Sequence, residues 1–539
     1  MREGYYSLVL SEKQILKDIE RIKRERDCFN DLRDFLKNPK PNKICALYGL
    51  RRTGKTVLMK QAYKELVESG CNAVFLEVKG KQEFYELEQD LDKIAKTGAQ
   101  VVFIDEITKA RDFIGLSSSL ANYYSSLFTL VVAGTDSMVL REAGNDSLYD
   151  RIYPIHTTYI PFREFHRLKE SVNLDGYLKN ELGLSVLSDL TRYEATHRYI
   201  RTSIVDNVKH SLEESMNFTP DEILERKISY EDLIYRVLND VNHRFVSNVF
   251  RKELKLSDLG TAAQNIRKAA IGELTDYVSF KEIEQKVEER MGIKRSMPII
   301  RDEAFYLTHY KNIMKQMDLF VDDPYYELSE AGMIRRESVN TILTLPGMRY
   351  SLAAEVIYAI LEDSTFATIP INVQNVILER IEQNILGLQL EEILRYDLRN
   401  YYSNRPEIEV AKISAGSAGE FDIAIINKKT GEADLFEVKH SSEYVPSTEE
   451  MPGQDKNFYN KQLMENVQRF FNPNIKGVIY NGPDRLNDDI KYLNAKKLLL
   501  DPGILETLKE KQTVTLDCKI TESAKKVVPA TIKSGTRER

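Results

Sequence analysis

Residues 49–56 read GLRRTGKT, which fits the phosphate-binding loop pattern Gly-x-x-x-x-Gly-Lys-Thr at every fixed position. The apolar run at 44–48 precedes the loop and an amphipathic stretch at 57–66 follows it, so the loop should join a strand to a helix. A glycine-rich turn in this context presents backbone N–H groups to phosphate oxygens at the positive end of a helix dipole. The motif therefore predicts a nucleotide-binding site.

The residues of the loop have separate expected roles toward ATP and Mg²⁺. Lys55 should reach the β- and γ-phosphates, and the Thr56 hydroxyl should ligate Mg²⁺. The alternative is an ordinary glycine-containing turn between a strand and a helix, without a ligand. The residues expected to contact the nucleotide here are Gly49, Arg52, Thr53, Gly54, Lys55 and Thr56.

A second motif, VVFIDE at 101–106, follows the loop by about fifty residues. Its continuous apolar run is typical of a strand buried on both faces. Asp105 at the end of that strand could hold Mg²⁺ through water, and Glu106 could polarise the water that attacks the γ-phosphate. Alone, the two acids could instead cap a helix, but after a phosphate-binding loop they favour ATP hydrolysis over binding alone.

The apolar run at 127–133 predicts a neighbouring strand, and it ends in Gly-Thr-Asp-Ser. Thr135 and Asp136 would face the γ-phosphate, or would simply form a strand-ending turn. Arg141 and Arg151 are candidates for neutralising charge in the transition state, in cis or from a neighbouring subunit. Both arginines could instead make surface ion pairs.

Two more predicted strands, at 72–78 and 157–162, bring the total to five strands that alternate with helices. This order predicts an α/β fold with a mostly parallel sheet covered by helices on both faces.

Together these residues resemble P-loop ATPases of the AAA+ type, and specifically a group of bacterial and archaeal ATPases with a C-terminal nuclease-like domain. The resemblance rests on GLRRTGKT, VVFIDEI, VVAGTDS and the run YIPFREF at 159–165, which is similar to the PxSFxEF stretch of that group. It covers about residues 35–170. It implies ATP hydrolysis coupled to a conformational change, often in a ring or a homo-oligomer.

A second chemical signal lies near the C-terminus, where two apolar runs at 419–426 and 433–440 flank the turn sequence NKKTG. They predict a β-hairpin. Alternation places Glu437 and Lys439 on one face, and Asp422 can point at the same spot. Two carboxylates and a lysine could bind Mg²⁺ and position a water for phosphodiester cleavage. The alternative is an amphipathic hairpin with these charges on a solvated face.

The order Asp, then Glu-x-Lys, resembles the PD-(D/E)XK nuclease superfamily over about residues 372–500. The resemblance implies a further acid from the preceding helix, for which Glu391 is the candidate, together with a helix at 457–471 and a strand at 478–480. The implied metal ligands are Glu391, Asp422 and Glu437, and Lys439 would neutralise charge or orient the water. Phe421 stands where the superfamily's name has proline.

The segment between these signals is rich in helical patterns. Apolar spacings at 193–214, 230–254 and 258–270 predict the helices of a lid. A helix at 302–318 and a hairpin at 319–328, split by Asp-Asp-Pro, suit a winged-helix module. Such modules bind DNA through a basic helix, but this helix also carries acids, and a protein–protein spacer fits equally well.

The length of 539 residues predicts about three domains, because single cores stop growing near roughly 250–300 residues. The N-terminal lead-in should contain a charged helix at 12–36, with the basic stretch 17–26 on a solvated face. The expected parts are the helical lead-in (1–38), the P-loop ATPase core (39–170), the helical lid (171–270), the winged-helix module or spacer (271–345), the small α/β nuclease-like domain (346–510), and a C-terminal strand with a basic, disordered tail (511–539).

Composition limits the partners and the compartment. The net charge of −7 means that any contact with DNA must come from local basic patches. The four cysteines show no CxxC pairing, which fits a reducing compartment without a disulfide framework or a zinc site. No apolar run approaches the roughly 18 residues of a membrane span, and no signal peptide is evident, so the expected location is cytoplasmic.

Two functions from different classes remain open. The first is an ATP-driven DNA-processing enzyme, in which the P-loop site drives or licenses a Mg²⁺-dependent nuclease, as systems that act against phage or mobile DNA would use. The second is a nucleotide-dependent switch or scaffold whose nuclease-like domain binds a partner without cutting. The presence of all the expected acids favours the first, whereas the acidic net charge favours the second.

Overall fold

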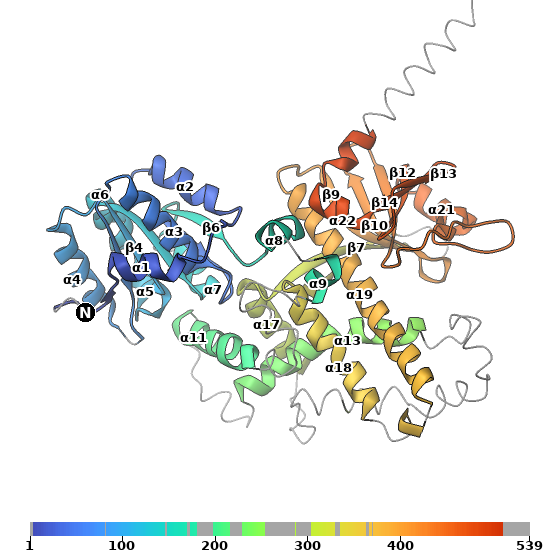
Figure 1. Ribbon diagram of the computed structural model, residues 1–539, viewed down its shortest axis with the longest axis horizontal. Helices are drawn as coiled ribbons and strands as arrows, with labels where there is room; N and C mark the ends of the chain where they lie inside the picture. The colour runs from blue at the N-terminus through green and yellow to red at the C-terminus, as the bar shows by residue number, and fades with distance from the viewer. Residues whose placement is uncertain are drawn as a thin grey trace, which may run out of the picture. The chain divides into compact units, whose positions relative to one another are not determined.

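The computed structural model divides the chain into two compact units (Figure 1). One comprises Met1–Pro324 and Val339–Ile393, and the other comprises Tyr325–Ser338 and Leu394–Arg539. Within them the structure describes residues 4–80, 82–145, 148–169, 173–179, 198–215, 229–253, 286, 303–328, 335–362, 366–368 and 370–509.

The first unit contains a six-stranded sheet in the order β1-β3-β4-β5-β2-β6. Neighbouring strands are parallel except at one edge, where β1 pairs antiparallel with β3. The predicted parallel α/β core is therefore confirmed. The strands are β1 (Leu8–Val9), β2 (Ile44–Tyr48), β3 (Ala73–Glu77), β4 (Val101–Asp105), β5 (Thr129–Gly134) and β6 (Ile152–His156).

Helices cover both faces of this sheet, so its central strands are apolar on both sides. Cys45 and Leu47 of β2 pack in the cluster that contains residues of α2 (Phe29–Lys37) and α3 (Lys55–Glu68). Ala46 packs on the other face, in the cluster that includes α4 (Phe84–Ala95). This two-sided burial explains why the strand sequences are continuous apolar runs.

The last strand of the sheet lies earlier than its predicted position. The strand expected at 157–162 is wrong, because β6 covers Ile152–His156 and residue 162 already begins helix α8 (Phe162–Leu168). Pro154 obscures the pattern, since proline cannot donate to a ladder and is confined mostly to edge strands. β6 is such an edge strand and pairs only with β2 among the described strands.

The N-terminal lead-in forms two helices where one was expected. Helix α1 (Glu12–Ile19) is capped by Ser11, whose hydroxyl accepts from the Gln14 amide at 3.3 Å. The chain then leaves the helix before α2 begins at Phe29. The lead-in belongs to the sheet of the first unit as well, because β1 adds an edge strand and the Leu10 amide donates to Phe75 O at 3.0 Å.

The middle of the chain is mostly helical where the structure describes it, apart from two strands between α17 and α18. The helices there include α9 (Leu174–Lys179), α11 (Asp206–Ser215), α13 (Tyr230–Glu253), α17 (Glu303–Gln316), α18 (Pro346–Leu361) and α19 (Ile371–Tyr401). The helix predicted at 258–270 lies outside the described residues. The hairpin predicted within 319–328 is wrong: Asp-Asp-Pro lies inside the single strand β7 (Phe320–Leu328), because Asp323 is buried and Asp322 pairs with Lys315.

The second unit is built on a sheet with the order β13-β14-β12-β11-β10-β9-β7-β8. The predicted hairpin is confirmed, since β10 and β11 pair antiparallel around the turn at 428–431. β9 is antiparallel to β10, whereas β12 is parallel to β11. The bounds are β8 (Arg335–Leu343), β9 (Ile408–Ser414), β10 (Glu420–Asn427), β11 (Glu432–Lys439), β12 (Asn472–Tyr480), β13 (Arg485–Asn487) and β14 (Ile490–Asn494).

Short helices follow the hairpin in this unit, among them α20 (Lys456–Tyr459), α21 (Lys461–Gln468) and α22 (Ala495–Leu500). The helix predicted at 457–471 is thus divided at Asn460, whose side chain accepts from the Leu463 amide at 3.1 Å and caps α21. Of the helices that the structure describes, none combines the length and apolar character that crossing a membrane requires.

Candidate functional sites

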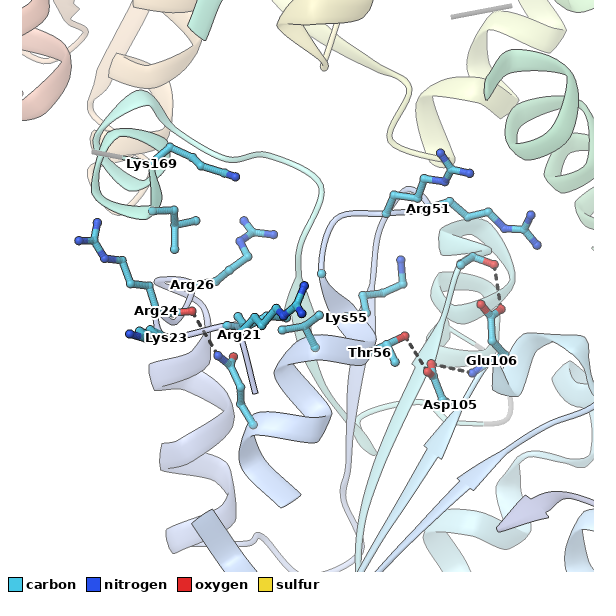
Figure 2. A pocket seen from close by; sticks show the side chains of 17 residues that line it. Arg21, Lys23, Arg24, Arg26, Arg51, Lys55, Thr56, Asp105, Glu106 and Lys169 are labelled. Carbon is cyan, nitrogen blue, oxygen red and sulfur yellow. Dashed lines mark hydrogen bonds between the residues drawn. The ribbon is translucent and has the colours of Figure 1, made fainter. Parts of the chain in front are cut away.

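A cavity of about 670 Å³ opens at the carboxyl ends of strands β2, β4 and β5 (Figure 2). Its size suits a nucleotide, and this edge of a parallel sheet is where α/β folds bind ligands. Acidic side chains line it at Asp105 and Glu106. The basic side chains that line it are Arg21, Lys23, Arg24, Arg26, Arg51, Arg52, Lys55 and Lys169. The excess of positive charge suits a polyphosphate.

The phosphate-binding loop has backbone conformations that only its two glycines adopt easily. Gly49 and Gly54 have φ of +140° and +97°. A Cβ atom at Gly49 would lie 2.6 Å from the Thr157 hydroxyl and 2.7 Å from the Thr158 hydroxyl. No side chain fits at that position, which explains the glycine.

Lys55 and Thr56 lie at the start of α3, where the motif places them. Lys55 Nζ donates to the carbonyls of Gly49 at 2.7 Å and Leu50 at 2.8 Å. Burial lowers the pKa of Lys55 to about 8, although nearby carboxylates oppose the shift. The ammonium group is thus held against the inner turn of the loop, where Lys55 lines the cavity.

Asp105 is the acid that Thr56 contacts. The Thr56 hydroxyl donates to Asp105 Oδ2 at 2.7 Å, and burial raises the pKa of Asp105. A hydroxyl and a carboxylate at this distance are hard oxygen donors of the kind that Mg²⁺ prefers. The pair therefore fits the predicted magnesium site.

Glu106 leaves the strand in a left-handed conformation with φ of +55°, which is uncommon for a residue other than glycine. Its Oε2 accepts from the Thr135 hydroxyl at 3.3 Å and lies 3.4 Å from Lys109 Nζ. Strained residues of this kind cluster at functional sites. Figure 2 shows Glu106 beside Asp105 at the edge of the cavity.

The structure separates the two residues expected to sense the γ-phosphate. Thr135 lines the cavity, whereas Asp136 is not among the lining residues. Asp136 Oδ1 instead accepts from the Val139 amide at 3.1 Å, at the start of α7 (Ser137–Asn145), and Oδ2 lies 3.1 Å from His210 Nδ1. The strand-ending turn is thus the reading that fits Asp136.

Neither candidate arginine lines this cavity in the described structure. Arg141 pairs with Asp318, and Arg151 contacts the side chain of Asn122. A role for either from a neighbouring subunit stays a prediction.

Arg26 is a site residue that the sequence interpretation missed. The sequence predicts the stretch 17–26 on a solvated helix face, but residues 22–26 have no regular secondary structure and Arg26 is only 8% exposed. Its guanidinium is 2.6 Å from Glu164 Oε1 and donates to the carbonyls of Thr53 and Thr157, each at 2.6 Å. Glu164 belongs to the YIPFREF run at 159–165.

The pKa of Lys55 predicts that ATP affinity depends on pH. Phosphate oxygens favour the charged ammonium, so binding should raise this pKa above about 8 and take up a proton in more alkaline solution. We expect the Kd for Mg-ATP to change little below about pH 7.5 and to rise by up to about tenfold per pH unit above pH 8. Calorimetric titration across this range would measure it.

Lys55→Arg is the matched variant, because a guanidinium stays charged throughout that range. Whatever affinity this variant retains should not fall between about pH 8 and 9.5. A wild-type Kd that stays constant over the same interval would contradict the interpretation of Lys55.

The second unit brings Asp422, Glu437 and Lys439 together on the hairpin. Lys439 Nζ lies 2.8 Å from Glu437 Oε2 and 3.7 Å from Asp422 Oδ2. Asp422 Oδ2 also accepts from the Val438 amide at 2.8 Å. Burial raises the pKa of Glu437, against the opposing charge of Lys439.

Two residues that the sequence interpretation did not single out complete this cluster. Asn457 Nδ2 donates to Glu437 Oε1 and, at 2.8 Å, to Glu420 O. Lys412 Nζ lies 3.9 Å from Asp422 Oδ1. No three His, Cys, Asp or Glu side chains of the described residues form a group that could hold a metal ion. Glu391, on α19, is buried and belongs to the first unit, and its predicted metal role stays a prediction.

The first of these sites matches a known family. Residues 41–166 match a family described as an AAA domain. A solved structure entitled "Closed State CryoEM Reconstruction of Hsp104:ATPyS and FITC casein" is similar at 13% identity with a TM-score of 0.25, over 53% of this chain and 54% of that chain. The matched part thus spans about half the length of that chain. No curated protein matches. Residues 41–166, which contain the phosphate-binding loop and its acidic partners, are thus similar to AAA domains.

Proposed function

We propose that the chain binds and hydrolyses ATP in the cavity of its AAA domain and couples this activity to a DNA-processing site in its second unit. The observation that carries the first part is the convergence of Thr56, Asp105 and Glu106 at the end of the cavity where Lys55 lies. These four groups supply phosphate binding, metal binding and a base for the attacking water, three of the roles that phosphoryl transfer to water requires of the protein.

Each side chain has one task in this hydrolysis. Lys55 holds the phosphate oxygens by charge, and its burial strengthens that attraction. Glu106 accepts a proton from the attacking water, and the Thr135 hydroxyl fixes the orientation of its carboxylate. Mg²⁺, held by Thr56 and through water by Asp105, would neutralise charge on the phosphates.

For the second unit we propose a Mg²⁺-dependent nuclease-like site of Asp422, Glu437 and Lys439. Its support is their convergence and the order of elements around them. Helix α19 precedes three antiparallel strands, and α20 and α21 lead to the parallel strand β12. Asp422 and Glu437 are oxygen donors suited to Mg²⁺. Lys439 would orient the water or offset negative charge at the scissile phosphate.

The alternative is a nucleotide-dependent switch or scaffold whose second unit binds a partner without cutting. Two observations favour it. Lys439 already offsets the charge of Glu437, and the described residues hold no group of three metal-type ligands. The net charge of −7 also opposes a general affinity for DNA.

Plasmid and linear DNA incubated with Mg²⁺ or Mn²⁺, with and without ATP, distinguish the two functions. If the nuclease proposal holds, Lys439→Ala should lower cleavage by about 10²- to 10³-fold, because it removes the charged group beside the acids. Lys428→Ala is the control, since this half-exposed lysine of the same hairpin pairs with Glu409, away from the cluster. Lys55→Ala and Glu106→Gln report whether ATP regulates cutting.

Equal cleavage by wild type and Lys439→Ala would contradict the assigned site. Absence of cleavage on every substrate, with ATP hydrolysis intact, would favour the switch.

A further inference from the structure

Asp318 is a buried acid outside the sequence motifs that nevertheless contacts the ATPase core. It lies in the turn between α17 and β7, with φ of +67° and 5% exposure. Its carboxylate pairs with Arg141, lies 3.0 Å from His156 Nε2 and accepts from the Thr158 hydroxyl at 3.3 Å. Burial alone would raise the pKa of Asp318, but His156 and Arg141 hold it below its ordinary value. The acid is therefore a fixed negative charge.

Thr158 connects this acid to the phosphate-binding loop. Its hydroxyl accepts from the Leu50 amide at 3.0 Å and is fully buried. A hydroxyl has one proton and two lone pairs, so donating to Asp318 fixes its rotation and leaves a lone pair directed at Leu50. The first turn of the loop is thus held by a hydroxyl whose orientation Asp318 determines.

Arg141 makes a second connection between the same two regions. Its guanidinium donates to Gln316 O at 2.9 Å, in the last turn of α17, and lies 5.3 Å from the centre of the Tyr48 ring. Tyr48 immediately precedes Gly49 and stacks on His156 with ring centres 5.1 Å apart. Tyr48 and Leu50, the two residues that flank Gly49, therefore both contact side chains that bind Asp318.

We propose that Asp318 is a positioning residue for the nucleotide site and links its occupancy to the α17–β7 turn. The inference rests on the proposed ATP-binding function and extends it to regulation. When ATP draws the loop around its phosphates, the Leu50–Thr158–Asp318 hydrogen bonds transmit the change to the turn. By linkage, any partner that displaces the turn alters ATP affinity by the same factor.

β7 carries this link along the chain. It runs directly on from the turn, and its residues Tyr325–Glu327 pair with the strand β9 that bears Lys412. If nucleotide binding moves the turn, the movement would therefore displace the start of β7. The other end of β7 belongs to the sheet of the second unit.

Thr158→Val tests the link without adding bulk, because it replaces the hydroxyl with a methyl group. We expect it to weaken Mg-ATP binding about five- to tenfold. Hydrogen exchange of peptides that cover residues 314–322 should respond to Mg-ATPγS in the wild type and respond much less in the variant. A purely structural role would change the melting temperature but would not remove this response.

Asp318→Asn is the second variant and keeps the acceptor for Thr158 while removing the charge that Arg141 needs. It should lose part of the exchange response and less of the ATP affinity. Asp489→Asn is the control, because this exposed acid pairs with Lys476 in the second unit and should change neither the exchange response nor the ATP affinity.

The outcomes distinguish a failure of the link between the nucleotide site and the α17–β7 turn from a failure of the proposed function. A wild type that binds Mg-ATP but shows no exchange response at 314–322 would overturn the link alone. So would a Thr158→Val variant with unchanged affinity and response. A wild type that binds no ATP would overturn the proposed function and the link together.

Discussion

Glu106→Gln should lower the kcat of ATP hydrolysis by about 10²- to 10⁴-fold, because an amide cannot accept the proton of the attacking water. ATP affinity should stay close to wild type. The substitution keeps the size of the side chain and an oxygen that can accept from Thr135, and it leaves Lys55 and Thr56 unchanged. Phosphate release measures kcat, and calorimetry with Mg-ATP measures the Kd.

Glu68→Gln is the matched control for this experiment. Glu68 ends helix α3, is largely exposed and pairs with Lys64, so its substitution should leave kcat unchanged. If Glu106→Gln kept more than about a tenth of wild-type turnover, another group would have to act as the base. If it abolished ATP binding, Glu106 would be holding the loop together.

Arg26→Ala should destabilise the folded state by about 3–5 kcal/mol, the range measured when one partner of a buried ion pair is removed. The substitution leaves the Glu164 carboxylate buried without its charge partner and removes the donor that the Thr53 and Thr157 carbonyls share. Urea unfolding of the full chain, followed at the transition that Mg-ATP shifts, measures the change in free energy.

The double variant Arg26→Met with Glu164→Gln separates charge from packing. It removes the unpaired charge, so its loss of stability should be smaller than the sum of the two single losses. Arg21→Met is the control, because Arg21 is exposed and should change stability by no more than about 0.5 kcal/mol. An Arg26→Ala variant as stable as Arg21→Met would show that the buried pair contributes little.

Local sequence was sufficient to predict the phosphate-binding loop and the acids beside it. Strand β2, Lys55, Asp105 and Glu106 lie where the motifs place them, because the loop and the carboxyl ends of parallel strands are set by short segments. The β10–β11 hairpin was predictable for the same reason: its turn and its alternation are local.

The features that could not be predicted from the sequence depend on contacts between residues far apart in the chain. Arg26 lies in a stretch whose composition is typical of a solvated helix face, and only its distance of 2.6 Å from Glu164 shows its role. Asp318 meets Thr158 across 160 residues of chain, and nothing near either residue records that contact. Pro154 in β6 and Asp323 in β7 show the same limit, since each breaks a strand pattern that its tertiary environment tolerates.

Phosphate release from ATP by the purified chain, with Mg²⁺ and beside the Lys55→Ala variant, tests the central claim most directly. We predict Mg²⁺-dependent turnover in the wild type, within the roughly 1–10³ s⁻¹ that is usual for enzymes or somewhat below it. Lys55→Ala should show no turnover above background, because it lacks the charge that holds the phosphates. A wild type without hydrolysis, or a variant as active as wild type, would contradict the assignment of this cavity as an ATPase site.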